Sequence, residues 1–204
     1  RIMYIPRHFA AKDSKSIELR FGKAPFGTYI EFIDNEIKVA HIPLLLDLDK
    51  QLASGHLALN NPLAQSWINH AAPAKGLFVV QGAAAYISSS WYQTEEVPTY
   101  NYIAYHINGT RTLSSAEQTD LDLKALVDYF ESQQPNGRLY TSYSAETLAQ
   151  SKGVLGFQFE IESIEGIEKL SQNRKEDQAV IIEQLENRCP YSQAIAQEMK
   201  KLNS

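Results

Sequence analysis

The residues best suited to chemistry gather between Phe78 and Gly109, where two apolar runs flank a loop rich in aromatic, hydroxyl and carboxylate side chains. In this stretch Trp91, Tyr92 and Tyr100 carry the flat rings that stack on a planar cofactor. Such a cluster serves core or dimer packing more often, and this alternative stays open. A polar, aromatic loop between two β-rich runs is typical of a site wall.

A second candidate site is the run Lys169 to Arg174, which reads KLSQNR. It places two cations beside hydroxyl and amide side chains, a composition suited to binding an anion. On composition alone the run would be an ordinary polar segment leading into a helix. The anion-binding turn is the hypothesis that we test against the structure.

Metal and acid–base chemistry have weaker signals. The histidines are His8, His41, His56, His70 and His106, and none shows the H-x-H or H-x₃-H spacing of a metal site. The one cysteine, Cys189, allows neither an internal disulfide nor a cysteine metal cluster. Adjacent carboxylates such as Glu95 and Glu96 usually form a solvated face. We therefore predict no metal site and no catalytic residue.

The composition bounds the class of protein. The chain has 204 residues, 44% of them hydrophobic and 21% charged, as in an ordinary globular domain. The net charge of −5 argues against a large nucleic-acid footprint. No apolar run approaches the roughly 20 residues of a membrane helix, and we expect a cytoplasmic protein.

The elements that position these residues follow from local patterns. Asp34-Asn35 separates the runs TYIEFI and EIKVAHIPLLL, which predicts a tight hairpin. Further strands are expected over residues 54–59, 76–88, 100–113 and 154–164. The predicted helix caps and breaks are Asn61 with Pro62, Ser114 with Glu117, Ser144, and Pro190 between two C-terminal helices.

Six strands that mostly precede the helices favour an α+β fold, an antiparallel barrel with appended helices, over a doubly wound sheet. We expect one domain over residues 1–204. Its barrel core would span about 24–164, and a helical tail about 175–204.

Several motifs resemble one known family. They are the opening MYIPRHF, the run His41 to Asp47, Gly55-His56, Gln81-Gly82, residues 85–88, Trp91-Tyr92, Val97-Pro98-Thr99, Asn101-Tyr102 and KLSQNR. Together they look like the signature of the PaiB-type, FMN-binding negative transcriptional regulators. That family is similar to the flavin split-barrel proteins, which dimerise around FMN.

The resemblance implies a six-stranded split barrel, a homodimer and FMN as the cofactor. It also implies a set of cofactor-binding residues: His41, Pro43, His56, Asn60, Gln81, Tyr86, Ser88, Trp91, Asn101, Lys169, Ser171, Gln172 and Arg174. On sequence alone, His41 and His56 would be polar groups satisfied at strand ends.

Four positions depart from the family pattern. Ala83-Ala84 stands where Pro-His is typical, Leu59 where an arginine is usual, and Ser89 where a proline is usual. If the missing histidine and arginine contact the cofactor in relatives, Ala84 and Leu59 predict weak or absent FMN binding.

Three functions stay open at this point. The first is an FMN-binding regulator, the second a flavin-dependent reductase or oxidase of a small molecule, and the third a binding protein without cofactor. Haem in place of FMN is a further alternative. From Glu165 onward there are six Lys/Arg and seven Asp/Glu, so we expect no tight direct DNA binding.

We also expect a dimer, because Trp67, Trp91, Tyr92 and the tyrosines near Tyr100 need cover that a small barrel interior does not offer. The loop from Ser88 to Asn101 would lie close to the subunit boundary. The interface would exceed roughly 2,000 Å², as in obligate homodimers.

Overall fold

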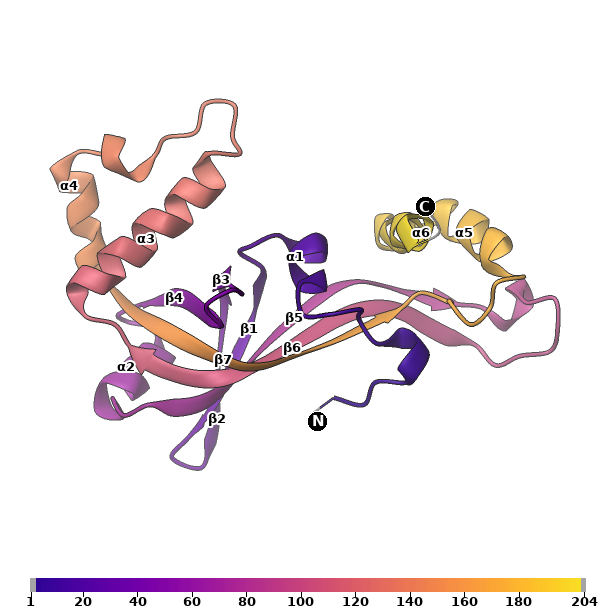
Figure 1. The fold of residues 1–204 in the computed structure, drawn as a ribbon, viewed down its shortest axis with the longest axis horizontal. Coiled ribbons are helices and arrows are strands. Elements are labelled where there is room, and N and C mark those ends of the chain that lie inside the picture. Colours follow the sequence, from indigo (N-terminus) through magenta and orange to yellow (C-terminus); the bar gives the residue numbers. More distant parts are fainter. Residues whose placement is uncertain (1–2, 203–204) are drawn as a thin grey trace. The chain divides into compact units, whose positions relative to one another are not determined.

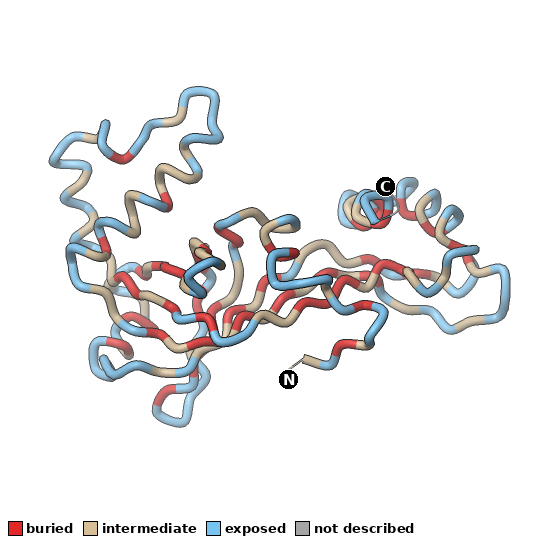
Figure 2. The backbone as a smooth tube through the Cα atoms, viewed as in Figure 1, coloured by how far each residue is buried: buried red, intermediate tan, exposed pale blue. Residues whose placement is uncertain are grey.

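The structure is a computed structural model that describes residues 3–202 (Figure 1). Its described part is an α+β fold with a seven-stranded antiparallel sheet in the order β2-β1-β5-β6-β7-β4-β3. The strands are β1 (Phe26–Ile33), β2 (Glu36–Pro43), β3 (Leu45–Asp47), β4 (Leu52–Ala58), β5 (Ala74–Ile87), β6 (Thr99–Leu113) and β7 (Val154–Lys169). Most buried residues lie along these strands (Figure 2).

The helices are α1 (Ser16–Phe21), α2 (Pro62–Asn69), α3 (Ala116–Glu131), α4 (Ala145–Leu148), α5 (Gln178–Glu186) and α6 (Pro190–Leu202). Short 3₁₀ turns cover Arg7–Phe9, Ser89–Trp91, Tyr140–Ser142 and Ala149–Gly153. No helix within residues 3–202 has the length and apolar character needed to cross a membrane.

The predicted hairpin is confirmed. Strands β1 and β2 pair antiparallel from Phe26 with Pro43 to Ile33 with Glu36. Asp34 and Asn35 both have positive φ, 53° and 61°. Two consecutive residues in this conformation form the turn whose twist matches that of the flanking strands, and Asp and Asn tolerate it better than most residues.

The predicted count of six strands is wrong by one. The run from Glu36 to Leu46 was expected to be a single strand, but it divides at Leu44 into β2 and β3. Strands β2 and β3 lie at opposite ends of the strand order, yet only Leu44 separates them in the chain. The sheet must therefore curl until its two edges adjoin at this residue.

Local caps begin the helices as expected, with one exception. Asn61 accepts a hydrogen bond from Leu63 N (2.9 Å) and Pro62 is the first residue of α2, as predicted. Ser144 caps α4, also as predicted. For α3 the predicted cap, Ser114, is wrong: Ser115 Oγ accepts from Gln118 N (3.1 Å), and the buried Ser114 Oγ has no partner among the described residues.

The chain forms two compact units. Unit 1 comprises residues 3–20, 80–106 and 165–202 of the described chain, and unit 2 comprises residues 21–79 and 107–164. Strands β5, β6 and β7 contribute residues to both units. The single domain expected from the sequence stays a prediction.

The core of unit 2 is aromatic and encloses an ion pair. Fully buried Trp67 packs edge-on against Tyr29 (ring centroids 5.5 Å apart) and Phe157 (4.9 Å). Glu31 accepts hydrogen bonds from Arg111 Nη2 (2.7 Å), Tyr29 Oη (2.9 Å) and Trp67 Nε1 (3.1 Å). A single buried carboxylate thus accepts hydrogen bonds from three side chains.

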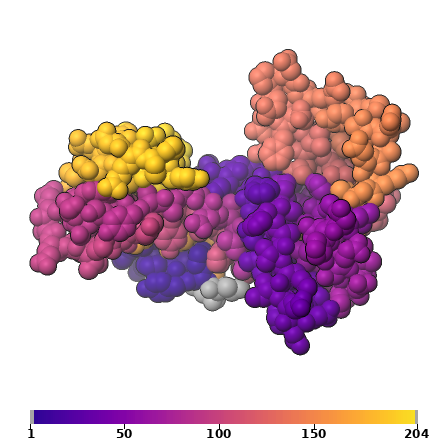
Figure 3. All heavy atoms as spheres, turned by 180° about the vertical axis from the view of Figure 1, so that it is seen from behind, coloured from indigo at the N-terminus to yellow at the C-terminus, as the bar shows by residue number. Residues whose placement is uncertain are grey.

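In unit 1, helices α5 and α6 pack together and cover the neighbouring strand residues. Figure 3 shows these C-terminal helices in yellow against the magenta residues of the same unit. Ile181, Leu185, Ile195 and Met199 are their buried residues on the apolar face. The predicted break between the two helices is confirmed, because Pro190 is the first residue of α6.

Candidate functional site

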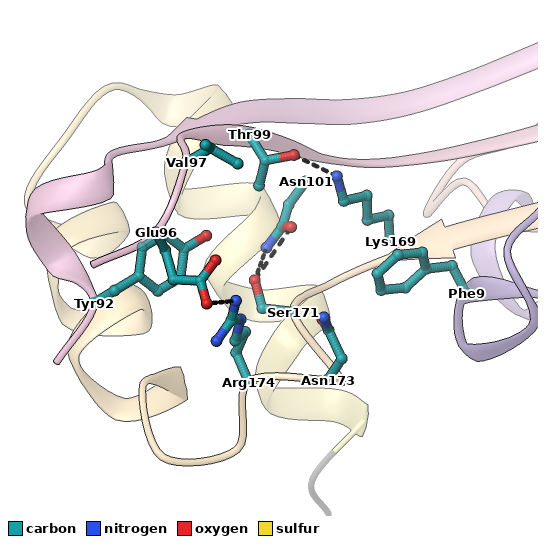
Figure 4. A pocket seen from close by; sticks show the side chains of 10 residues that line it. All are labelled: Phe9, Tyr92, Glu96, Val97, Thr99, Asn101, Lys169, Ser171, Asn173 and Arg174. Carbon is teal, nitrogen blue, oxygen red and sulfur yellow. Dashed lines mark hydrogen bonds and ion pairs between the residues drawn. The ribbon is translucent and has the colours of Figure 1, made fainter. Parts of the chain in front are cut away.

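A pocket in unit 1 brings the two candidate segments together (Figure 4). Its volume is about 180 Å³. The lining residues come from the 3₁₀ turn Arg7–Phe9, the loop before β6, the start of β6, the end of β7 and the turn that follows it: Phe9, Tyr92, Glu96, Val97, Thr99, Asn101, Lys169, Ser171, Asn173 and Arg174. The aromatic loop and the KLSQNR run, 70 residues apart in the chain, therefore form one site.

The turn after β7 is held by its own side chains. Gln172 Oε1 accepts from Leu170 N (2.8 Å), and Gln172 Nε2 donates to Glu168 O (2.5 Å). Ser171 has φ of 60°, uncommon for a residue other than glycine, and its carbonyl accepts from Arg174 N (3.0 Å). Gln172 thus shapes the turn, and its side chain does not line the pocket.

Buried polar contacts fix the floor of the pocket. Asn101, at 0% exposure, donates from Nδ2 to Ser171 Oγ (2.9 Å) and contacts Met199 Sδ at 3.5 Å. Ser171 is also buried. Because buried polar groups are costly when unpaired, this contact holds the start of β6 to the turn after β7.

Lys169 is the cation at one end of the pocket. Its Nζ donates to Thr99 Oγ1 and lies 5.6 Å from the centroid of the Phe9 ring. Burial lowers the pKa of Lys169 from its ordinary value. Within residues 3–202 no carboxylate forms an ion pair with this ammonium group, so an anionic ligand would supply the missing counter-charge.

Arg174 is the second cation, and it is already paired. Its Nη2 forms an ion pair with Glu96 Oε1, and its guanidinium carbon lies 5.5 Å from the centroid of the Tyr92 ring. The hydrogen bond to Glu96 raises the pKa of Arg174. The solvated face predicted for the two glutamates holds for exposed Glu95, but Glu96 turns toward the pocket.

The other predicted residues of unit 1 lie outside the pocket lining. Gln81 and Tyr86 are exposed on β5, and the Tyr86 ring meets that of Tyr100 edge-on at 5.8 Å. Ser88 Oγ accepts from Ser90 N (3.3 Å). Trp91 is buried, with the Arg188 guanidinium 4.6 Å from its ring centroid.

Four predicted residues belong to unit 2. His41 is exposed on β2, and its Nδ1 lies 3.0 Å from Thr28 Oγ1. Pro43 ends that strand, and Asn60 is exposed beyond β4. His56 lines a second, narrow cleft beside Thr119, Asp122 and Leu126, and burial lowers its pKa.

Reasoning from the sequence missed five members of the site: Phe9, Glu96, Val97, Thr99 and Asn173. All of them except Glu96 stand inside the motifs that carry the family resemblance, so these motifs could have indicated them. Glu96 had no such signal.

The donor set suits a phosphate group. The pocket carries one ammonium, one guanidinium, three hydroxyls and two amides, all of which can donate to phosphate oxygens. Its volume is below the roughly 300–1,000 Å³ of pockets that enclose a whole cofactor-sized ligand. It therefore fits the phosphate end of a flavin mononucleotide, and the ring system would lie outside it.

The described residues offer no comparable metal site: no group of three or more His, Cys, Asp or Glu side chains among them could hold an ion.

The structure also shows where two residues that depart from the family pattern lie. Ala84 lies on β5 without lining the pocket, and Leu59 lies in unit 2, where its N–H donates to Gly153 O (2.9 Å).

Comparison with known proteins places the chain among flavin-binding relatives. Residues 3–163 match the family described as "Putative FMN-binding domain". The chain is 34% identical over 189 residues to the protease synthase and sporulation protein PAI 2 of Bacillus subtilis (strain 168), covering 91% of this chain and 90% of that one.

Two solved structures share the fold. The FAD and haem binding protein of Mycobacterium smegmatis aligns with a TM-score of 0.57 and 13% identity, covering 78% of this chain and 73% of that one. The flavocytochrome Anf3 of Azotobacter vinelandii aligns with a TM-score of 0.55 and 12% identity, covering 86% and 78%. At these identities the likeness concerns the fold alone.

Proposed function

This chain belongs to the PaiB-type family of FMN-binding proteins, as the sequence predicted, and we propose that it is a homodimeric regulator that holds the phosphate of FMN in the unit 1 pocket. FMN is its cofactor. The regulatory role is supported by the family resemblance and by the name of the Bacillus subtilis relative, which refers to protease synthesis and sporulation. The cytoplasmic location and the split-barrel form of the curled sheet are part of the same proposal.

The observation that carries the phosphate assignment is the unpaired ammonium of Lys169. It lies in a pocket with Arg174 and three hydroxyls, burial lowers its pKa, and no carboxylate within residues 3–202 forms an ion pair with it. A phosphate dianion would supply that charge and accept hydrogen bonds from several donors at once.

The ring and ribityl chain of FMN would extend beyond this pocket. The predicted contacts outside it are His41, Pro43, His56, Asn60, Gln81, Tyr86, Ser88 and Trp91. Among these, exposed Tyr86 with its neighbour Tyr100 offers flat rings for stacking. Buried Trp91, already stacked by Arg188, is better suited to supporting the loop.

The dimer has a different basis from the one expected at first. Trp67 and Trp91 are covered within their own chain, at 0% and 7% exposure. Among the described residues, one cluster of uncovered apolar side chains is the outer face of the β1–β2 hairpin, where Phe26, Phe32, Ile37 and Val39 are exposed. We call these four residues the hairpin face, and a second copy of the chain would cover it.

Direct DNA binding is not part of the proposal. Of the six cations from Glu165 onward, Lys169 and Arg174 line the pocket, Arg188 stacks on Trp91, and Lys200 and Lys201 pair with glutamates, which leaves only exposed Lys175. A DNA-binding surface needs its cations free to contact phosphates. A regulator of this kind would act through a partner or through its ligand.

The phosphate assignment is tested by titrating the purified protein with FMN and with riboflavin. Lys169→Met should weaken FMN binding roughly tenfold or more, because it removes a charge-assisted hydrogen bond, and should leave riboflavin binding unchanged. The matched control is Lys175→Met, an exposed cation in the same segment that does not line the pocket. Equal losses for both flavins, or no FMN binding by the parent protein, would contradict the proposal.

A further inference from the structure

The ion pair between Glu96 and Arg174 lies inside the pocket that the proposed function assigns to phosphate (Figure 4). The carboxylate of Glu96 occupies the Arg174 Nη2 group. Its neighbour Glu95 is exposed and makes no ion pair within residues 3–202. Of the two adjacent glutamates, Glu96 therefore pairs with a cation of the pocket, and Glu95 does not.

A guanidinium group binds carboxylate and phosphate oxygens in the same planar, forked geometry. A phosphate that enters the pocket meets a guanidinium whose fork is partly taken by Glu96. A dianion attracts the pocket cations more strongly than a single carboxylate does, whereas a neutral ligand has no means of displacing it.

We propose that Glu96 is an internal competitor that occupies Arg174 until a ligand phosphate displaces it, so that Glu96 limits the affinity of the pocket for phosphorylated flavins and leaves riboflavin binding unaffected. This inference rests on the proposed function and adds the residue that tunes the affinity for phosphate.

The exchange requires movement of only a short segment. The beginning of the loop is anchored, because Gln93 N donates to Asp177 Oδ1 (2.9 Å) and Gln93 Nε2 donates to Glu176 O (3.0 Å). Beyond Gln93, Val97 is 76% exposed. Glu96 can therefore leave Arg174 while the anchored half of the loop keeps its contacts.

The test compares Glu96→Gln with its matched control, Glu95→Gln, in the full-length chain. Both variants remove one negative charge from adjacent positions of one loop, but only Glu96→Gln removes the partner of Arg174. Binding of inorganic phosphate is measured by calorimetry, and binding of FMN and riboflavin by fluorescence. We expect Glu96→Gln to bind phosphate and FMN roughly fivefold more tightly, with riboflavin unchanged, and Glu95→Gln to match the parent protein.

A double variant tests whether Glu96→Gln changes the affinity through Arg174. In an Arg174→Gln background, Glu96→Gln should no longer increase affinity, because the group for which the two anions compete is absent. Unchanged or weaker FMN binding by Glu96→Gln would overturn the inference and assign Glu96 to positioning Arg174. The same follows from an equal gain for riboflavin or an equal gain in Glu95→Gln.

The outcomes separate this inference from the proposed function. If no variant binds FMN while Glu96→Gln binds inorganic phosphate more tightly, the FMN assignment fails and the competition stands. If FMN binds and Glu96→Gln has no effect, the competition fails and the FMN assignment stands. If neither phosphate nor FMN binds any variant, both fail.

Discussion

At the scale of single residues, the largest departure from the sequence analysis is the buried pair of Glu31 and Arg111. Side chains alternate along β1, and Tyr29, Glu31 and Ile33 all point into the core. The alternation identifies this face, but it does not reveal that a carboxylate on it meets an arginine 80 residues later. Such a pairing depends on the order of strands in the sheet, which no local pattern contains.

Glu31→Gln should destabilise the protein by about 3 kcal/mol, because it leaves the Arg111 guanidinium buried without a counter-charge. Tyr29 and Trp67 would also lose the carboxylate that accepts their hydrogen bonds. Urea unfolding followed by far-UV circular dichroism measures the change. The matched control is Glu36→Gln on the exposed β2, whose pair with Lys38 should matter little. A loss as small as that of the control would show that the pair is not essential to the fold.

At the scale of elements, local signals predicted most strands and helices because each has a local physical cause. Asp34-Asn35 supplies the positive φ values of a tight turn, and Asn61 with Pro62 supplies a cap and a compatible first residue. No local pattern within the run from Glu36 to Leu46 indicates that the strand divides at Leu44. The division follows from the curl of the sheet, which moves the chain from one edge to the other.

The start of α3 offers a test between two adjacent serines. Ser115→Ala should cost about 1 kcal/mol of stability, because it removes the side chain that accepts from Gln118 N. Ser114→Ala should be neutral or slightly stabilising, since the buried Ser114 Oγ has no partner among the described residues. Thermal unfolding of both variants checks this. Equal losses, or a larger loss for Ser114→Ala, would restore Ser114 as the cap.

At the scale of the whole molecule, the sequence predicted the class of fold and the two segments of the pocket, but not which surface stays uncovered. The aromatic count suggested that Trp67 and Trp91 needed a partner subunit. Trp67 is instead enclosed by Tyr29 and Phe157, and Trp91 by Arg188. Burial is a property of three-dimensional packing, so a list of large residues does not tell which of them face outward.

The hairpin face follows from the register of β1 with β2. Phe32 pairs with Ile37, and Ile30 pairs with Val39, so apolar side chains stand side by side across the two strands. Exposed apolar residues scattered singly need no explanation, whereas a contiguous apolar sheet face is typical of a subunit interface. His41, a predicted cofactor contact, lies on the same strand and is also exposed.

Val39→Lys should therefore dissociate the dimer, because a twofold interface buries the new ammonium twice and leaves both copies without a partner. Light scattering at micromolar concentration should give a stable dimer for the parent protein and a 23.0 kDa monomer for the variant. The matched control is Leu19→Lys on α1, an 85% exposed leucine that belongs to unit 1 and not to the hairpin. A parent protein that is monomeric would refute the dimer. A variant that stays dimeric would move the interface to another surface.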